Sequence, residues 1–253
     1  MKEKEKEKTE TMKNQNRNNQ KITIVILTLL GIFMFSSLTL ATPTGPSDVN
    51  ITSNETKGTT GAYMVNISGG YISKLNLTAT VKNPRWKAFV GWIDGKFTLD
   101  DASGSTIYDW TLSSVGGEVY ATRASATVSW ETISCANASE ITAEDTALNH
   151  TAEDNITSTF TADSNSGTFV VAGTTIAAND CSSTNTYVNN ATQAIDFEEV
   201  ILHDETDIVY ATILEEDEVG YDGGTYDFQM LVPENGLETW SGATAYYLYV
   251  ELN

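Results

Sequence analysis

Cationic side chains are scarce in this sequence, and they stop altogether before its midpoint. The 253 residues include 14 Lys and Arg against 34 Asp and Glu, which gives a formal charge of −20. After Arg123 there are 23 acidic residues and no Lys or Arg. So dense a negative charge repels phosphate backbones and anionic lipid headgroups, which excludes nucleic acid and the membrane surface as partners.

One stretch near the N-terminus lacks charge of either sign. Residues 22–41 form an apolar run that follows a charged region, residues 1–21. This is the pattern of a secretory signal peptide, with cleavage predicted after Ala41. The run is also long enough to span a bilayer as one helix, so an uncleaved membrane anchor is the alternative. In both cases we expect an exported protein, located at the cell surface or outside the cell.

Histidine and cysteine are also rare, with two of each. Neither His150 nor His203 lies in a motif of the Ser-His-Asp or Cys-His kind, so we expect no enzyme. In an exported chain, Cys135 and Cys181 predict a disulfide, and a zinc site or a thiol nucleophile is the alternative. Closing a loop of roughly 47 residues would stabilise the fold by about 4 kcal/mol.

Acceptor signals for N-linked glycans are abundant, in contrast. From 15 Asn and 49 Ser or Thr after Ala41, about 3.5 Asn-x-Ser/Thr sequons are expected by chance, and eight are present. We therefore expect a glycoprotein that carries N-linked glycans. The candidate acceptors are Asn50, Asn54, Asn66, Asn76, Asn137, Asn149, Asn155 and Asn190.

Composition divides the exported part into a stalk and a β-rich domain. Residues 42–61 are rich in Thr, Ser, Gly, Pro and Asn without a period, which is typical of a flexible linker. Residues 62–253 then carry short Val-, Ile-, Thr- and aromatic-rich runs between turn residues, and each run predicts a strand. These runs include residues 63–68, 71–82, 125–133 and 195–202. Within 71–82, Leu75, Leu77 and Val81 alternate with polar residues, so we expect one buried and one exposed face. The predicted fold is all-β, an antiparallel β-sandwich of immunoglobulin-like or jelly-roll-like type.

The stretch between the cysteines interrupts these strands. Residues 135–181 contain three sequons and read as a glycan-bearing loop held by the disulfide. Residues 139–150, "SEITAEDTALNH", predict one short helix with Ser139 as its N-cap. A further strand is expected at "GTFVVAGTTI", residues 167–176.

Acidic residues gather in "EDEVGYDGGTYDFQM", residues 216–230. The spacing fails the EF-hand pattern, but Asp217, Glu218 and Asp222 could supply oxygens to an irregular calcium site. The simpler interpretation is a solvated hairpin tip whose charges discourage edge-to-edge pairing. Apart from that calcium alternative, we expect no cofactor.

"DGGTYDF", Asp222 to Phe228, resembles the start of strand F in immunoglobulin-like domains. In that family a tyrosine hydroxyl bonds back to nearby backbone and holds the corner, a role that the resemblance assigns to Tyr226. The resemblance covers roughly residues 195–253 and places Phe228 in the core. It departs from the family at Cys135 and Cys181, which are not at the usual inter-sheet positions.

In overall style the chain resembles archaeal-type cell-surface glycoproteins, which implies a structural role as a surface-layer or filament subunit. Its expected partners are copies of itself or other surface proteins, which would bind through sheet edges or an inserted strand. The run "AYYLYVEL", residues 245–252, is apolar on both faces and predicts a central strand or one covered by a partner. The alternative function is an adhesin or carbohydrate-binding module, because five tryptophans could stack on sugars. We expect most of them in the core: Trp86, Trp92, Trp110, Trp130 and Trp240.

Overall fold

A computed structural model describes residues 42–112, 114–125, 127–192, 196–237 and 239–252. The predicted signal or anchor segment, residues 22–41, lies outside these ranges, as does the charged region before it. Over the described ranges, no helix combines the length and the apolar character that crossing a membrane requires.

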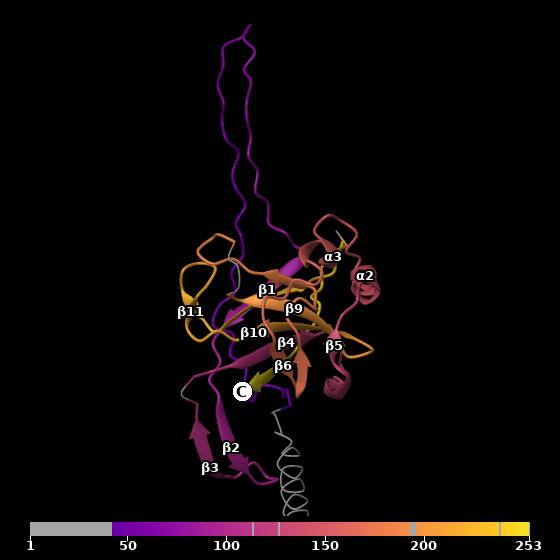
Figure 1. The fold of residues 1–253 in the computed structure, drawn as a ribbon. Helices are drawn as coiled ribbons and strands as arrows, with labels where there is room; N and C mark the ends of the chain where they lie inside the picture. Colours follow the sequence, from indigo (N-terminus) through magenta and orange to yellow (C-terminus); the bar gives the residue numbers. More distant parts are fainter. Residues whose placement is uncertain (1–41, 113, 126, 193–195, 238, 253) are drawn as a thin grey trace, which may run out of the picture. The chain divides into compact units, whose positions relative to one another are not determined.

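Strands are the main secondary structure, and every pairing between them is antiparallel, which confirms the predicted all-β class (Figure 1). In the described ranges, two short α-helices and one 3-10 turn accompany the strands. The elements are β1 (Trp86–Gly91), β2 (Lys96–Asp100), β3 (Thr106–Thr111), β4 (Gly117–Thr122), η1 (Trp130–Thr132), β5 (Ser134–Cys135), α2 (Ala138–Ala147), α3 (Ile156–Thr159), β6 (Phe169–Val171), β7 (Thr174–Ile176), β8 (Ser183–Asn185), β9 (Glu198–His203), β10 (Ile208–Ile213), β11 (Glu218–Val219), β12 (Thr225–Tyr226), β13 (Phe228–Pro233) and β14 (Tyr247–Leu252).

The largest sheet has the strand order β14-β4-β10-β9-β5, with β8 also paired to β9. A separate two-stranded sheet pairs β1 with β13, from Trp86 opposite Pro233 to Gly91 opposite Phe228. Three hairpins, β2–β3, β6–β7 and β11–β12, complete the strand pairings.

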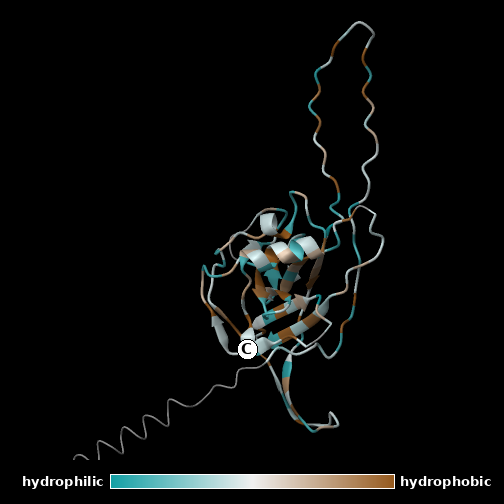
Figure 2. Cartoon of the chain, turned by 90° about the vertical axis from the view of Figure 1, so that its right-hand side faces the viewer, coloured by the Kyte–Doolittle hydropathy of each residue, from teal (hydrophilic) through white to brown (hydrophobic). Residues whose placement is uncertain are grey.

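Both faces of the six-stranded sheet are covered, and each face has its own hydrophobic cluster. Successive residues of β4 show the alternation, because Val119 and Ala121 belong to one cluster and Tyr120 to the other. The first cluster also contains Met230 of β13, and the second contains Val171 of β6. Burial on both faces explains why the longer strands β4, β9 and β10 carry apolar residues at successive positions. Figure 2 shows the hydrophobic stretches gathered in the strands of the body.

Helix α2 begins two residues before the predicted start. Asn137 is its N-cap and accepts hydrogen bonds from the backbone N–H groups of Ser139 and Glu140, while the Glu140 carboxylate accepts from Asn137 N–H. The prediction of Ser139 as N-cap is therefore wrong. An acid three residues after the cap completes a capping box, and Ser139 has Thr142 at that position.

Residues 45–83 are all exposed and contain no strand, so the strands predicted at 63–68 and 71–82 are wrong. Leu75, Leu77 and Val81 were expected to share a buried face, but they are 59, 82 and 83% exposed. Alternating apolar residues form a stable strand only when another strand supplies hydrogen-bond partners. Figures 1 and 2 show this segment leaving the body and returning to it, and β1, the first strand in the described ranges, begins after it at Trp86.

Three further expectations about strands need correction. The run at 125–133 forms no long strand, because Trp130–Thr132 is a 3-10 turn. The run at 167–176 is a tight hairpin, β6–β7, rather than one strand. Strand β14, predicted to be central or covered by a partner, is the edge strand beside β4, so the central position is wrong; in the described ranges its outer side carries one isolated bridge, to Thr44.

Candidate functional site

The predicted disulfide is present. Cys135 lies on β5 beside β9, Cys181 is fully buried after β7, and the two sulfur atoms are bonded. The bond encloses α2, α3 and the β6–β7 hairpin, so the stretch expected to be a loop contains folded elements. Neither cysteine remains free for metal binding or nucleophilic chemistry.

None of the eight sequon asparagines is buried in the core. Two are half-buried, Asn149 and Asn155, and the remaining six are exposed. Four of those six lie in the exposed 45–83 segment, namely Asn50, Asn54, Asn66 and Asn76. Asn190 lies in a turn where Asn189 and Asn190 both have positive φ, a conformation that asparagine adopts more readily than most residues.

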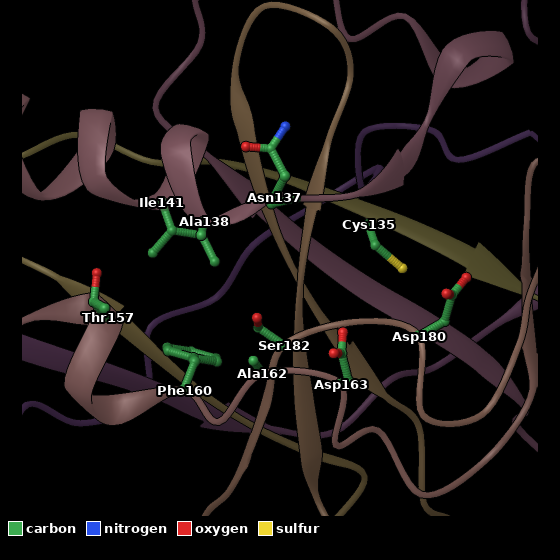
Figure 3. Close-up of a pocket in the computed structure, with 11 residues that line it drawn as sticks. Cys135, Asn137, Ala138, Ile141, Thr157, Phe160, Ala162, Asp163, Asp180 and Ser182 are labelled. Atoms are coloured by element: carbon green, nitrogen blue, oxygen red, sulfur yellow. The ribbon is translucent and has the colours of Figure 1, made fainter.

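Two of the acceptors also cap helices. Asn137 accepts through Oδ1 at the start of α2, and Asn155 accepts from the Ser158 N–H at the start of α3, at 2.7 Å. The side-chain amide offers its carbonyl oxygen and its nitrogen as separate groups. A glycan is attached to the nitrogen, so the oxygen can keep its capping role. Figure 3 shows the Asn137 amide directed away from the side chains of Phe160 and Ser182.

A pocket of about 440 Å³ lies beside the disulfide, between α2 and the residues after α3. Its wall is formed mainly by small and apolar side chains, including Ala138, Ile141 and Phe160 (Figure 3). The carboxylates that line it, Asp163 and Asp180, belong to exposed residues. This surface offers no buried pair of ionisable groups for acid–base chemistry.

The acidic stretch forms the expected hairpin, in which Glu218 of β11 lies opposite Tyr226 of β12. Asp217, Glu218 and Asp222, the calcium candidates, are all exposed at its tip. Asp222 accepts hydrogen bonds from Gly224 N–H at 2.9 Å and from the Tyr226 hydroxyl at 3.0 Å. Across the described residues, no group of three or more His, Cys, Asp or Glu is arranged to hold a metal ion.

Tyr226 holds the corner differently from the immunoglobulin-like pattern. Its hydroxyl donates to the side chain of Asp222, whereas the family's tyrosine bonds to backbone. Phe228 is half-buried at the margin of the first cluster. Strands F and G share a sheet in that family, but β13 pairs with β1 and β14 pairs with β4, in two different sheets.

Most tryptophans are exposed, contrary to expectation. Trp92, Trp110 and Trp240 are 57, 50 and 45% exposed, whereas Trp130 is buried and Trp86 half-buried. Among the described residues, no ring contact joins two tryptophans.

Trp92, directly after β1, contacts an aromatic pair on the β11–β12 hairpin. Its ring lies 5.2 Å from that of Tyr226 at an angle of 36°, and Tyr226 in turn stacks on Tyr221 at 6.1 Å. Its indole N–H donates to the Thr225 carbonyl at 2.8 Å. These contacts hold the hairpin against the end of β1.

The two histidines lie in separate environments. His203 Nδ1 lies 3.3 Å from Glu140, which connects β9 to α2, and His150 is buried with its Nε2 against the Glu234 carbonyl. Neither position gathers several carboxylates around a histidine within the described part of the chain.

The most unusual ionisable groups are buried acids that sequence reasoning missed. Glu118, Glu199 and Glu251 lie on strands of the six-stranded sheet and are at most 3% exposed. Burial and the neighbouring Glu251 raise the pKa of Glu118 to about 8, and burial also raises the pKa of Glu199 and of Glu251. The adjacent acids Glu198 and Glu199 in an apolar run were the available signal, because a strand buried on both faces must bury both.

Comparison of the chain with protein-family models, with curated proteins and with solved structures finds no match.

Proposed function

We propose that this protein is an exported structural glycoprotein of the cell surface, a subunit of a surface layer or extracellular filament that assembles with copies of itself. The observation that carries the proposal is the placement of the sequons, since all eight acceptor asparagines lie outside the core. A buried disulfide between Cys135 and Cys181 supports an oxidising compartment, where such bonds persist. No catalytic step, metal or other cofactor forms part of the proposal.

The scaffold in this proposal is a β-sandwich, in which the β1–β13 pair packs over part of the six-stranded sheet. Met230 and Val232 of β13 share a hydrophobic cluster with Val119 and Ala121 of β4, which supports face-to-face packing of the two layers. Its strand order differs from the immunoglobulin order, because β13 and β14 belong to different sheets.

Purification of the protein from its own host tests the proposal. Glycopeptide mapping and intact mass measurement are expected to show occupied sequons, an N-terminus after Ala41 or an intact anchor, and one disulfide. Electron microscopy of the native surface is expected to show a regular lattice or filaments that contain the protein. A cytosolic protein without glycans, with both thiols reduced and no assembly, would contradict it.

A carbohydrate-binding module is the second candidate, and the exposed aromatic group supports it. Trp92, Tyr226 and Tyr221 form this group where the β11–β12 hairpin meets the end of β1, and aromatic faces bind sugar rings. The rings of Trp92 and Tyr226 are tilted by 36° rather than coplanar, which makes a flat sugar platform less suitable there.

Tryptophan fluorescence separates the two candidates. For a structural subunit, a panel of saccharides at millimolar concentration leaves the emission of the wild-type protein unchanged. A saturable change that Trp92→Ala removes and Trp110→Ala retains would favour the carbohydrate-binding candidate.

A further inference from the structure

The β1–β13 pair has two outer edges, and the edge on β13 is closed by the protein itself. The outward N–H of Leu231 donates to the buried Glu199 carboxylate at 2.7 Å, and the outward carbonyl of Gln229 accepts from the Thr212 hydroxyl at 3.0 Å. Pro233 has no N–H, and its carbonyl accepts from the Tyr246 hydroxyl at 2.7 Å. This edge therefore has no capacity for another strand.

The edge on β1 is open. Glu234 N–H donates to the Arg85 carbonyl, so Arg85 directs its backbone groups toward the β13 side. Along an antiparallel strand, alternate residues direct their backbone N–H and C=O groups toward the partner strand and away from it. Ala88 and Val90 lie an odd number of residues after Arg85, so their backbone groups are directed away from β13. In the part of the chain that the structure describes, β1 pairs only with β13 and no bond satisfies these outward groups. Ala88 is exposed and Val90 half-buried, so an incoming strand can reach them.

This open edge adjoins another incompletely paired edge, on β14. At the start of β1, Lys87 donates to the Thr244 carbonyl and lies over the Tyr246 ring. After β1, Gly95 lies against the side chain of Leu252, at the end of β14. Half-buried apolar side chains border this seam between β1 and β14: Phe89, Ile93, Leu248, Val250 and Leu252.

The chain also contains a strand-like segment without a partner strand. In residues 71–82, Leu75, Leu77, Ala79 and Val81 alternate with Asn76, Thr78 and Thr80. The segment is fully exposed and forms no strand, although its period is that of a strand with one buried face. In such a strand the Asn76 glycan acceptor would lie on the solvent face, because it alternates with the apolar residues.

The local structure directs this segment away from the β1 edge of its own chain. Asn83 donates to the Asp154 carboxylate at 2.6 Å, and Arg85 forms an ion pair with the same carboxylate at 3.1 Å. The indole N–H of Trp86 donates to the Asp154 carbonyl at 2.7 Å. These bonds fasten residues 83–86 to the turn before α3, and the preceding chain leaves the body there (Figure 1).

Charge favours another copy of the protein as the partner. Residues 62–83 contain Lys74 and Lys82 and no acid, whereas residues 84–253 contain four bases and 28 acids. The exposed segment is therefore positive and the body strongly negative, so a segment from one copy is attracted to the body of another.

We propose that residues 71–82 of one copy add a strand to the open β1 edge of the next copy, and that this exchange links the subunits of the assembly. The proposal rests on the structural function proposed above and specifies its interface. Backbone groups of Ala88 and Val90 bind the incoming strand, and its apolar face covers the seam between β1 and β14. Because each copy supplies a segment and an edge, the contact is head-to-tail and extends into a chain of subunits.

Amide hydrogen exchange of the full glycosylated protein tests the interface whatever the register of the added strand. As the protein concentration rises and assemblies form, exchange in residues 71–82 and 86–90 is expected to slow at least tenfold. Residues 45–60, in the same exposed segment, are expected to remain fast at every concentration.

A pair of matched substitutions tests the role of the apolar face. Leu77→Glu is expected to weaken assembly at least tenfold by analytical ultracentrifugation, whereas Thr80→Glu, on the opposite face, retains it. Both residues are exposed in the single copy, so circular dichroism of the two unassembled variants is expected to match the wild type.

The possible outcomes distinguish failure of this interface from failure of the proposed structural function. Assembly without slowed exchange at 71–82 and 86–90, or equal effects of the two substitutions, would overturn the interface and leave the structural function standing. Slowed exchange that is independent of concentration would show pairing within one chain and would also overturn the interface. Failure of the native protein to assemble at all would overturn both.

Discussion

Glu118 on β4 lies directly opposite Glu251 on β14, and both carboxyl groups are buried. The Tyr120 hydroxyl donates to Glu251 at 2.9 Å and approaches Glu118 at 3.4 Å, while Ala172 N–H donates to Glu251 from the β6–β7 hairpin. Two facing carboxylates repel each other in a site of low polarity, so at least one carries a proton near neutral pH. The arrangement makes the stability of the sheet depend on pH.

Stability is expected to fall as the pH rises from about 4.5 to about 8. Burial, with Glu251 nearby, raises the pKa of Glu118 from 4.5 to about 8, so over this range the folded state retains a proton that the unfolded state releases. Each such carboxyl lowers the free energy of unfolding by about 1.4 kcal/mol per pH unit. Urea unfolding at several pH values measures the slope of the free energy of unfolding against pH. Glu118→Gln is expected to make it shallower, and Glu153→Gln, at an exposed site, to leave it unchanged; parallel curves for all three proteins would contradict the assignment.

A second carboxyl sets the acid limit of stability. Burial alone would raise the pKa of Glu234, but hydrogen bonds from Thr244, Lys87 and Asn235 hold it at about 2. The contribution of the Glu234 carboxylate to the free energy of unfolding is complete above about pH 4.5 and is lost as the pH falls toward 2. With the opposite dependence of Glu118, this places the stability maximum near pH 4 to 5. Glu234→Gln is expected to reduce the loss between pH 4 and 2; a loss as steep as that of the wild type would contradict the role.

The four longer strands of the six-stranded sheet, β4, β9, β10 and β14, could be predicted from sequence because each lies in a run rich in apolar residues, whereas the short strands β5 and β8 have no such run. The run predicted at 195–202 is an example, and its acids also indicated that both faces are buried, since only a doubly covered strand places Glu198 and Glu199 in the interior. The disulfide was predictable because exported chains rarely keep two unpaired cysteines.

The 71–82 segment shows what sequence patterns cannot decide. Its alternation predicts a strand, but a strand also needs a neighbour, and the pattern does not identify one. The same limit applied to β14, whose apolar character on both faces predicted a central position. An edge strand can carry that character when one face packs on the core and side chains such as Tyr249 pack on the other cluster.

Loss of the disulfide is expected to destabilise the protein by about 4 kcal/mol, because the bond restricts a loop of roughly 47 residues in the unfolded chain. The variant with Cys135→Ala and Cys181→Ala leaves no thiol and no buried polar group at these positions. Chemical unfolding of this variant, beside the reduced wild-type protein, measures the change. A difference below about 1 kcal/mol would show that residues 136–180 are held by their own packing instead.

The helix cap at Asn137 and its glycan acceptor can be separated by substitution. Asn137→Asp removes the acceptor and keeps a capping oxygen, so its stability is expected to match that of the unglycosylated wild type. Asn137→Ala removes both and is expected to cost about 1 kcal/mol. Ser139→Ala keeps the capping asparagine but destroys the sequon, so glycopeptide mapping is expected to find this site unoccupied. Equal stability of the Asp and Ala variants would contradict the capping role.

Arg123, the last Lys or Arg in the sequence, is expected to stabilise the contact of α2 with the six-stranded sheet. Arg123, just after β4, donates through Nε to Glu144 at 2.7 Å and through Nη2 to its second oxygen, and the Glu144 side chain is only 9% exposed. Arg123→Met leaves this carboxylate without its partner and is expected to cost about 2 kcal/mol, between the values for exposed and fully buried pairs.

A double-variant cycle isolates the pair itself. If the cost arises from the unpaired carboxylate, Glu144→Leu in the Arg123→Met background is expected to restore most of the lost stability, because no buried charge then remains. Arg123→Lys is expected to give an intermediate value, since an ammonium group cannot reproduce the two-point contact. Urea unfolding of the four proteins at pH 6 measures the coupling, and additive effects of the two substitutions would contradict it.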